Sequence, residues 1–356
     1  MCLTTNDYIS GMELFTKVDI PASSIHIDYT SHIAFFGSCF ADNISAQFAA
    51  RKFGVLANPF GTVYNPISIA GQIKAIADGK VFGESDVFQN ARGLQDARGA
   101  QGASGIQDAR GPWHSWDAHG SLSAATREEC IAKLNDATNR TREFLKQADV
   151  VFITLGTAFV YFLKESGEAV ANCHRQDATL FERRMITVEE ATRALENIVQ
   201  DLRRVNPEAH IVFSVSPLRH MADGAHNNTL SKAKLQLAVN NVINKVTTVP
   251  SASSGTLPVS YFPSYEIVMD ELRDYRFYSD DMVHLSKTAE EYIFERMAET
   301  YCSEKTRKDI AQVEKFMKMQ NHRVADANSP AALEFARTLS AKAAELEAQI
   351  PGLDLH

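Results

Sequence analysis

The first strongly apolar segment of the chain ends at two side chains that can act as nucleophiles. Residues 32–36 have the composition of a buried strand, which breaks at Gly37, and helical character follows over residues 42–53. Between them stand Ser38 and Cys39. A turn from a strand into a helix exposes a side chain at the carboxyl end of a parallel sheet and directs the helix N-terminus at any anion formed there. Ser38 and Cys39 are therefore candidate nucleophiles, and an ordinary strand–helix turn is the alternative interpretation.

A second group with chemical potential precedes the last helix of the main pattern. Asp281 and His284 stand three residues apart, just before Ser286, which we expect to cap a helix that extends to about Tyr301. At this spacing the Asp281 carboxylate can set the tautomer of the His284 imidazole and stabilise the imidazolium that forms when it takes a proton. We therefore predict that His284 acts as a general base and that the Asp281 carboxylate orients it.

These side chains require elements that bring them to one edge of a sheet. Strands are expected at residues 32–36, 150–155, 210–215 and 259–262, and helices near 67–76, 127–147, 187–205, 231–246 and 286–301. Apolar strands that alternate with amphipathic helices predict an α/β fold, in which a mostly parallel sheet is doubly wound between two helical layers. Ligands bind such sheets at the carboxyl ends of the strands, where Gly156 and Thr157 are expected beside the Ser38–Cys39 turn.

The pattern divides the chain into a main domain and two additions. We expect the α/β domain over residues 25–302 and a helical extension over 303–356, which either lies on the domain or forms a homo-oligomer interface. Residues 89–111 contain a short duplicated unit rich in Gly and poor in apolar side chains. This segment predicts a flexible surface insertion that the chemistry does not need.

Composition excludes several classes of function. The chain has 356 residues and a formal net charge of −8 without a basic run, which argues against nucleic-acid binding. No apolar stretch reaches the length of a membrane span, and the N-terminus lacks the layout of a signal peptide. The five cysteines form no CxxC pair and no zinc-binding spacing. We therefore expect a cytoplasmic protein with free thiols and without a cofactor.

Several segments together resemble the GSCFA family. The five residues of that name stand intact at 37–41, and the resemblance extends to the loop 58–66, to Trp113-His114, to residues 172–174 and to His284. The family in turn is similar to the SGNH/GDSL hydrolases. The resemblance implies a flavodoxin-like, three-layer fold of SGNH type and a reaction at an ester or acyl group of a carbohydrate or small molecule.

The resemblance also implies roles for the candidate catalytic residues. When the chain is set without a gap on the Gly-Asp-Ser block of the hydrolases, Gly37 meets the glycine and Cys39 meets the nucleophilic serine. This alignment favours Cys39 over Ser38 as the nucleophile. A thiol at a helix N-terminus beside an imidazole is expected to have a lowered pKa. Asp281 and His284 match the Asp-x-x-His block.

The oxyanion site that the resemblance implies is incomplete. Gly61 is the candidate for the backbone donor of the second block, and Gly156 matches the glycine of the third. Ala158 stands where the third block has its asparagine, and loss of one oxyanion donor typically costs ~10²–10³ in rate. Trp113 and His114, with Trp116, are candidates for an aromatic wall against a sugar ring. The full set of oxyanion or substrate-binding candidates is Gly61, Gly156, Thr157, Asn58, Asn65, Asn172, His174, Trp113 and His114.

Three functions remain open from the sequence. The first is an acyl-transfer enzyme with water or a sugar hydroxyl as acceptor, and no residue pattern separates esterase from transferase. The second is a metal-dependent hydrolase with zinc or manganese, although the spacing of its candidate ligands matches no helical ligand pair. Those candidates are His114, Asp117, His119, His174 and His284. The third is a non-catalytic binding module with an unreactive Cys39, an option that Ala158 supports.

Overall fold

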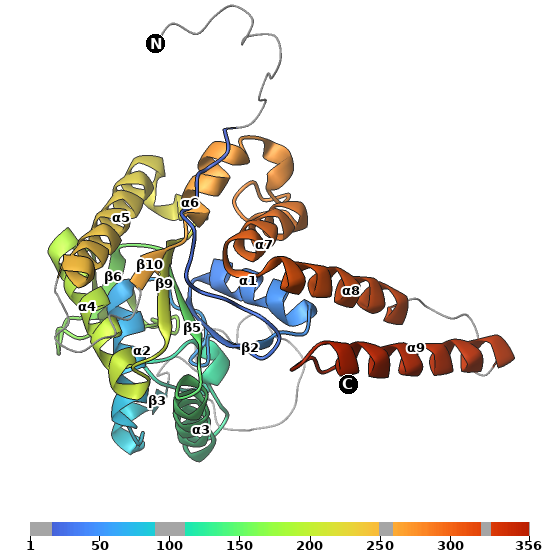
Figure 1. Cartoon of the computed structure of the whole chain (residues 1–356). Coiled ribbons are helices and arrows are strands. Elements are labelled where there is room, and N and C mark those ends of the chain that lie inside the picture. The colour runs from blue at the N-terminus through green and yellow to red at the C-terminus, as the bar shows by residue number, and fades with distance from the viewer. Residues whose placement is uncertain (1–15, 90–110, 249–258, 322–328, 356) are drawn as a thin grey trace, which may run out of the picture.

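A parallel sheet of five strands forms the centre of the protein (Figure 1). A computed structural model describes residues 16–89, 111–248, 259–321 and 329–355. The strands are β1 (His32–Gly37), β2 (Gly54–Ala57), β5 (Val150–Leu155), β9 (His210–Val215) and β10 (Val259–Tyr261). They pair in the order β10-β9-β5-β1-β2, and every pair is parallel. Counted along the chain, this is the flavodoxin-like order 2-1-3-4-5, whose switch point lies between β1 and β5.

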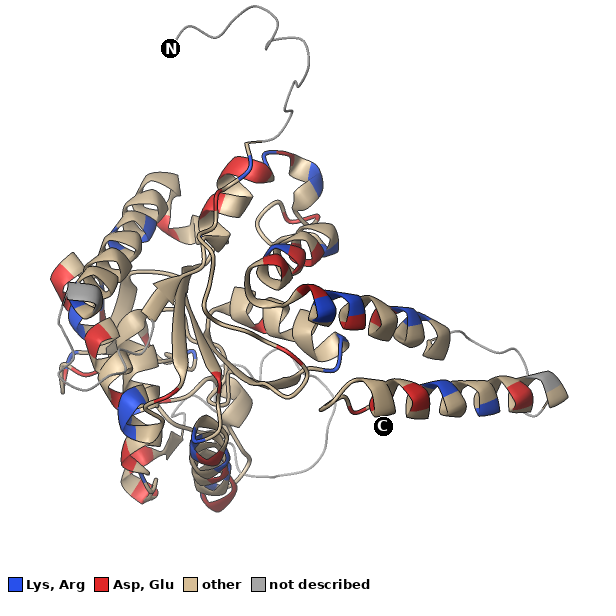
Figure 2. Cartoon of the chain, viewed as in Figure 1, with Lys and Arg blue, Asp and Glu red and all other residues tan. Residues whose placement is uncertain are grey.

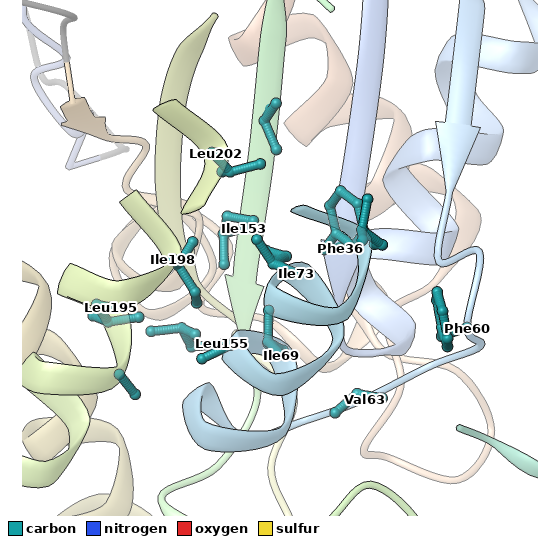
Figure 3. Close-up of a cluster of buried hydrophobic side chains, with 14 of the residues drawn as sticks. Phe36, Phe60, Val63, Ile69, Ile73, Ile153, Leu155, Leu195, Ile198 and Leu202 are labelled. Atoms are coloured by element: carbon teal, nitrogen blue, oxygen red, sulfur yellow. The ribbon is translucent and has the colours of Figure 1, made fainter. Parts of the chain in front are cut away.

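Helices cover both faces of this sheet. On one face lie α2 (Pro66–Asp78), α3 (Arg127–Leu145), α4 (Val188–Val205) and α5 (Ala225–Thr248), and on the other lie α1 (Cys39–Ala50), α7 (Lys287–Tyr301) and α8 (Glu304–Gln320). Figure 3 shows how Ile73 of α2 and Ile198 of α4 meet Ile153 of β5 in the first of the two cores. Because strand side chains alternate between faces, Phe36 joins this core and its neighbour Phe35 joins the second.

Shorter elements surround the main sheet. Beside it are a three-stranded antiparallel sheet, in the order β7-β6-β8, and the antiparallel pair β3-β4. Their bounds are β3 (Phe88–Gln89), β4 (Trp113–His114), β6 (Phe159–Leu163), β7 (Ala169–Val170) and β8 (Phe181–Met185). The short α6 (Ser264–Glu266) follows β10, and α9 (Pro330–Gln349) is the last helix.

The predicted α/β fold with a doubly wound, mostly parallel sheet is confirmed, with three local differences. Strand β2 escaped prediction because its four residues lie at the sheet edge, partly or fully exposed, and make no apolar run. Helix α1 begins at Cys39 and not at 42, because Ser38 is its N-cap. Helix α5 begins at Ala225 and not at 231, since its first turns carry polar side chains without an apolar period.

The C-terminal segments expected to be helical are confirmed as α8 and α9, which lie side by side (Figure 1). Buried side chains of α8, among them Val313 and Phe316, pack into the second core together with Leu346 of α9. Figure 2 shows basic and acidic residues interspersed along both helices. The division at residue 303 stays a prediction, and most of the insertion 89–111 lies outside the described residues. Among the described helices, none is long and apolar enough to cross a membrane.

Candidate active site

The turn between β1 and α1 requires a glycine at its centre. Gly37 has a φ of 133°, and a Cβ there would lie 2.0 Å from the carbonyl oxygen of Thr154 on β5. Only glycine therefore allows β1 and β5 to approach so closely at their carboxyl ends. The Gly37 N–H donates to Oδ1 of Asn58 at 2.8 Å, and its carbonyl accepts from the Val63 N–H at 3.0 Å. The loop after β2 thus holds the turn in place.

The two candidate nucleophiles differ in exposure. Ser38 is only 1% exposed, and its hydroxyl has no hydrogen-bond partner among the described residues. Cys39 is half-buried and is the first residue of α1. The backbone N–H groups of Cys39 and Phe40 face its sulfur and lower its pKa. The thiol therefore lies at the start of a helix, where first-turn N–H groups have no partner within the helix.

Burial opposes ionisation of this thiol. It raises the pKa of Cys39, and the Asp42 carboxylate raises it further, while the two N–H groups and Lys232 act in the opposite direction. The net shift is upward, so the expectation of a lowered pKa is wrong for the structure as it stands. Loss of solvation and a nearby carboxylate outweigh the helix N-terminus here.

A buried lysine lies behind the turn, and the sequence did not point to it. Lys232 of α5 is 1% exposed, and its Nζ donates to the carbonyl oxygens of Gly156 at 2.6 Å and Ser216 at 2.7 Å. Burial lowers its pKa to about 7, Cys39 opposes the shift and Arg219 adds to it. The apolar period of α5, extended from Leu235 toward the N-terminus, reaches Lys232 and would have revealed it.

The predicted dyad is formed in the loop that precedes α7. Nδ1 of His284 lies 2.5 Å from Oδ2 of Asp281, and Oδ1 accepts the N–H groups of Val283 and His284, each at 2.9 Å. These hydrogen bonds, that of the imidazole foremost, lower the pKa of Asp281 to about 2. An ionised Asp281 can only accept, so Nδ1 carries the proton and Nε2 is left as a base. Both side chains are 52% exposed.

His220 connects the dyad with the Cys39 turn. Its ring stands edge-on to Tyr64 at 5.3 Å between centroids. Burial first, then the charges of Lys232 and His284 among others, lower the pKa of His220 to about 4, and Cys39 contributes to a raised pKa of Tyr64. His220 thus feels the charges of both Lys232 and His284, while Cys39 interacts with Lys232 and Tyr64. The hydrogen bonds of the described residues include none between Cys39 and His284.

Backbone groups proposed for the oxyanion site are already engaged. The Gly61 N–H donates to the carbonyl oxygen of Asn58 at 2.7 Å, while those of Gly156 and Thr157 donate to that of Tyr64 at 2.7 and 3.0 Å. The Ala158 N–H donates to the Ser231 hydroxyl at 2.7 Å. These contacts leave the first-turn N–H groups of α1 as the donors nearest the sulfur.

The asparagine candidates also have structural partners. The Asn58 side chain bridges the Gly37 N–H and Oδ1 of Asp42, at 2.8 and 2.7 Å. Asn65 caps α2 by accepting from the Ser68 N–H at 2.8 Å. Oδ1 of Asn172 accepts the His174 N–H at 2.7 Å. Each amide therefore stabilises a turn or a helix start.

The aromatic candidates form a separate cluster around β4. The rings of His114 and His174 lie 4.4 Å apart, and Trp116 stacks on Phe88 at 3.8 Å. Nε2 of His174 lies 2.7 Å from the Ser115 carbonyl oxygen, and burial lowers the pKa of His174 to about 4.

Trp113 and Arg183 define the borders of this cluster. The Arg127 guanidinium lies 4.6 Å from the centre of the Trp113 ring. The Arg183 charge opposes the rise that burial causes in the pKa of Cys173, and it adds to the lowering of the pKa of His220. It also forms an ion pair with Asp223 at 2.6 Å.

The five candidate metal ligands do not form one group, although the rings of His114 and His174 lie close together. Oδ2 of Asp117 pairs with Lys80 at 2.9 Å, His119 accepts from the Ser121 N–H, and His284 pairs with Asp281. Within the described parts of the chain, no three His, Cys, Asp or Glu side chains are placed to hold a metal ion. The geometry therefore does not support a metallohydrolase.

Comparison with known families matches most of this chain to one of them. Residues 32–297 match the GSCFA family. The chain belongs to the GSCFA family. No curated protein sequence matches it.

Two solved structures are similar to this GSCFA protein at low identity. A carbohydrate esterase of family 3 from Talaromyces cellulolyticus aligns with a TM-score of 0.27 and 10% identity, over 51% of this chain and 67% of that one. An acetyl xylan esterase, Est2A, from the rumen bacterium Butyrivibrio proteoclasticus aligns with a TM-score of 0.31 and 13% identity. That match covers 69% of this chain and 57% of the esterase, so the chain spans little more than half of its length.

In this GSCFA chain the name-giving residues form the start of α1. Their glycine provides the close approach to β5, Ser38 occupies the N-cap position without a side-chain hydrogen bond, and Cys39 is the first residue of the helix. The site also contains Lys232 and His220, which lie far along the chain from the motif. Sequence spacing alone does not reveal such neighbours, because only the sheet brings β1 and β9 together at one edge.

Proposed function

We propose that the protein is an acyl-transfer enzyme of SGNH-like type that acts on an ester of a carbohydrate or small molecule. Cys39 is its nucleophile, His284 is its general base, and Asp281 orients His284. One observation carries this proposal: a half-buried thiol stands at the first turn of α1, beside the switch point of the sheet, with two N–H groups facing its sulfur. The free thiols of the described cysteines fit a reducing, cytoplasmic location.

The exposure of the two candidates favours Cys39 over Ser38. A nucleophile must reach a substrate carbonyl, and the Ser38 side chain is buried beneath Gly156 and Tyr64. Ser38 also has no imidazole or carboxylate to take its proton, since its hydroxyl lacks a partner in the described structure. Cys39 has access to solvent, and a thiolate needs less activation than a hydroxyl.

The reaction that we propose is a two-step acyl transfer. The Cys39 thiolate adds to the substrate carbonyl carbon, and the oxyanion is held by the N–H groups of Cys39 and Phe40. The bond to the leaving oxygen breaks as the His284 imidazolium gives that oxygen a proton. Nε2 of the neutral His284 then takes a proton from water or a sugar hydroxyl, whose oxygen attacks the thioester. The C–S bond breaks, and the Cys39 thiolate and the His284 imidazolium are restored.

A second candidate function is a non-catalytic binding module. Two observations favour it: the raised pKa of Cys39, and Ala158 at the position where the related hydrolases hold an oxyanion asparagine. In this case the carboxyl edge of the sheet still binds an ester or sugar, but Cys39 reacts no faster than an ordinary thiol.

Intact-mass analysis after incubation with activated acetyl and longer acyl esters tests the proposal. We expect an acyl adduct on the wild type and on Ser38→Ala, and none on Cys39→Ala. His284→Ala should form the adduct at least ~10²-fold more slowly, since it lacks the proton-transfer group. Cys173→Ala is the matched control, because Cys173 is also half-buried and free, and it should behave as the wild type.

The outcome that contradicts the enzyme is equally clear. If no variant gains an acyl group and Cys39 reacts with an alkylating reagent no faster than a free thiol, the nucleophile proposal fails. The binding module then becomes the preferred function.

A further inference from the structure

Lys232 is a buried cation without a carboxylate partner. Its side chain is 1% exposed, and its two hydrogen bonds go to neutral carbonyl oxygens, those of Gly156 and Ser216. Among the described residues, no acidic side chain forms an ion pair with it. Burial of an ammonium group is costly unless an anion or a full set of hydrogen bonds compensates. A lysine in this position therefore calls for an anion that the resting contacts do not supply.

The position of this ammonium is fixed behind the Cys39 turn. Gly156 follows the end of β5, and a Cβ placed on it would lie 3.2 Å from the Cβ atoms of Ser38 and Tyr64. The carbonyl oxygen of this same Gly156 accepts from Nζ of Lys232. Gly156 therefore lies between the Lys232 ammonium and Ser38, the residue that precedes Cys39.

The two carbonyl groups leave one position on the nitrogen open. An ammonium has three N–H groups, and Gly156 and Ser216 accept two of them. The interaction with Cys39 is mutual, because each group, when charged, shifts the pKa of the other toward its ionised form. A thiolate is therefore the anion that this site can offer to Lys232.

Several other charged or titratable groups surround Lys232 and Cys39. From α1, Asp42 opposes a thiolate on Cys39, and Tyr64 is the titratable group from the loop before α2. From the loop after β9, Arg219 repels the ammonium, and the His220 ring stands edge-on to Tyr64. Lys232 is the one side-chain cation among the causes that lower the pKa of Cys39.

We propose that Lys232 is a positioning residue that favours the thiolate form of Cys39 and offsets part of the effect of burial, an inference that rests on the proposed role of Cys39 as nucleophile. Two carbonyl oxygens, those of Gly156 after β5 and Ser216 after β9, hold the ammonium, and Gly156 in turn packs against Ser38 at the start of α1. It acts through Cys39 and makes no contact with substrate. In this arrangement the imidazole of His284 is left to serve the leaving group and the acceptor.

The pH profile of Cys39 alkylation tests this role. The purified full chain is treated with iodoacetamide between pH 5.5 and 10, and the modification of Cys39 is followed by peptide mass spectrometry. In Lys232→Met we expect the midpoint to move up by about one unit or more and the rate at pH 7 to fall at least ~10-fold. The matched control is Lys234→Met, which removes another α5 lysine that donates to a carbonyl oxygen, that of Ile186. It should keep the wild-type profile.

A second variant guards against failure of folding. Lys232→Gln keeps an N–H donor for the carbonyl groups but has no charge, and circular dichroism establishes that the variant is folded. A wild-type profile in folded Lys232→Gln or Lys232→Met would overturn the proposal, because the lysine would then only fill space and satisfy two carbonyl groups. A raised midpoint in either folded variant supports it.

The readout separates this inference from the proposed function. Alkylation needs a thiolate but neither an oxyanion site nor an acyl donor. A Lys232-dependent profile in a protein that gains no acyl group would therefore contradict the enzyme and support the role of Lys232. Acylation of Cys39 with a profile that is independent of Lys232 would contradict only the role of the lysine.

Discussion

At the carboxyl edge of the sheet, burial favours the neutral form of some side chains, whereas hydrogen bonds keep another side chain ionised. Loss of solvent raises the pKa of Cys39 and lowers that of Lys232 to about 7, so each group alone favours its neutral form. Asp281, by contrast, lies in solvent, and its hydrogen bonds keep it ionised with a pKa of about 2. The site therefore combines the half-buried Cys39 thiol with the solvated Asp281–His284 pair, and this division suits the proposed reaction, in which the acceptor enters from water.

His174 gives a pH-dependent stability that can be measured. Burial lowers its pKa to about 4, against about 6.5 in the unfolded chain. Between these values the unfolded state binds more protons, so the free energy of unfolding falls as the pH falls. The contribution is complete above pH 6.5, and about 1–2 kcal/mol of it should be lost by pH 5.

Denaturant unfolding at pH 7.5 and pH 5 tests this expectation. His174→Gln should show a smaller loss than the wild type, while His226→Gln, which alters an exposed histidine of α5, should follow the wild type. Equal losses in all three proteins would show that His174 does not contribute.

The β1–α1 turn depends on backbone contacts that no side chain can replace. Gly37 combines a positive φ with an approach of 2.0 Å between the position of a Cβ and the Thr154 oxygen. The turn is also held by Asn58, whose own backbone N–H donates to the Phe35 carbonyl. The loop after β2 and the strand β5 thus fix the direction in which α1 begins.

Two glycine substitutions should have opposite effects on stability. Gly37→Ala adds strain and a backbone clash, and we expect it to lower the free energy of unfolding by at least about 3 kcal/mol. Gly71→Ala is the matched control, since Gly71 lies within α2 with nothing near its would-be Cβ. It should stabilise the protein by about 0.5–1 kcal/mol. Denaturant midpoints measure both, and a tolerated Gly37→Ala would refute the need for a glycine.

The C-terminal helices complete the second core of the protein. The buried residues of α8 and the end of α9 pack with those of α1 and α7 on one face of the sheet. Arg51 of α1 also pairs with Glu314 of α8 at 2.6 Å. The helices therefore cover apolar surface that α1 and α7 alone would leave in water.

Substitutions along α9 test whether these helices unfold with the sheet. Leu346 is 0% exposed and Leu333 is 53% exposed on the same helix. Leu346→Ala should lower the free energy of unfolding by about 2–4 kcal/mol, and Leu333→Ala should change it by less than about 0.5 kcal/mol. The change should appear equally in circular dichroism and in the fluorescence of Trp113 and Trp116, which lie far from α9 in the chain. A shift in circular dichroism alone would show that the helices unfold separately.

The sequence by itself determined the class of fold, the α1 turn and the dyad. Each strand or helix must bury apolar side chains, and the spacing of those side chains along a short segment reveals the type of element. The Asp281–His284 hydrogen bond was also predictable, since three residues in one loop suffice to form it. The capping box of α4 is equally local, because its two partners, Thr187 and Glu190, stand three residues apart at the helix start.

Only the tertiary structure decided which groups meet at the site. Strand β2 forms because it can pair with the edge of β1. Its four residues have too little apolar pattern for the strand to be predicted from the sequence. Gly61 and Gly156 matched an expected motif, yet both N–H groups donate to backbone carbonyls of the loop between β2 and α2. Lys232 reached the Cys39 turn through the packing of α5 on β5 and β9. Burial and contacts between distant segments arise only when the chain is folded, so the shift in the pKa of Cys39 could not be predicted from its neighbours in the sequence.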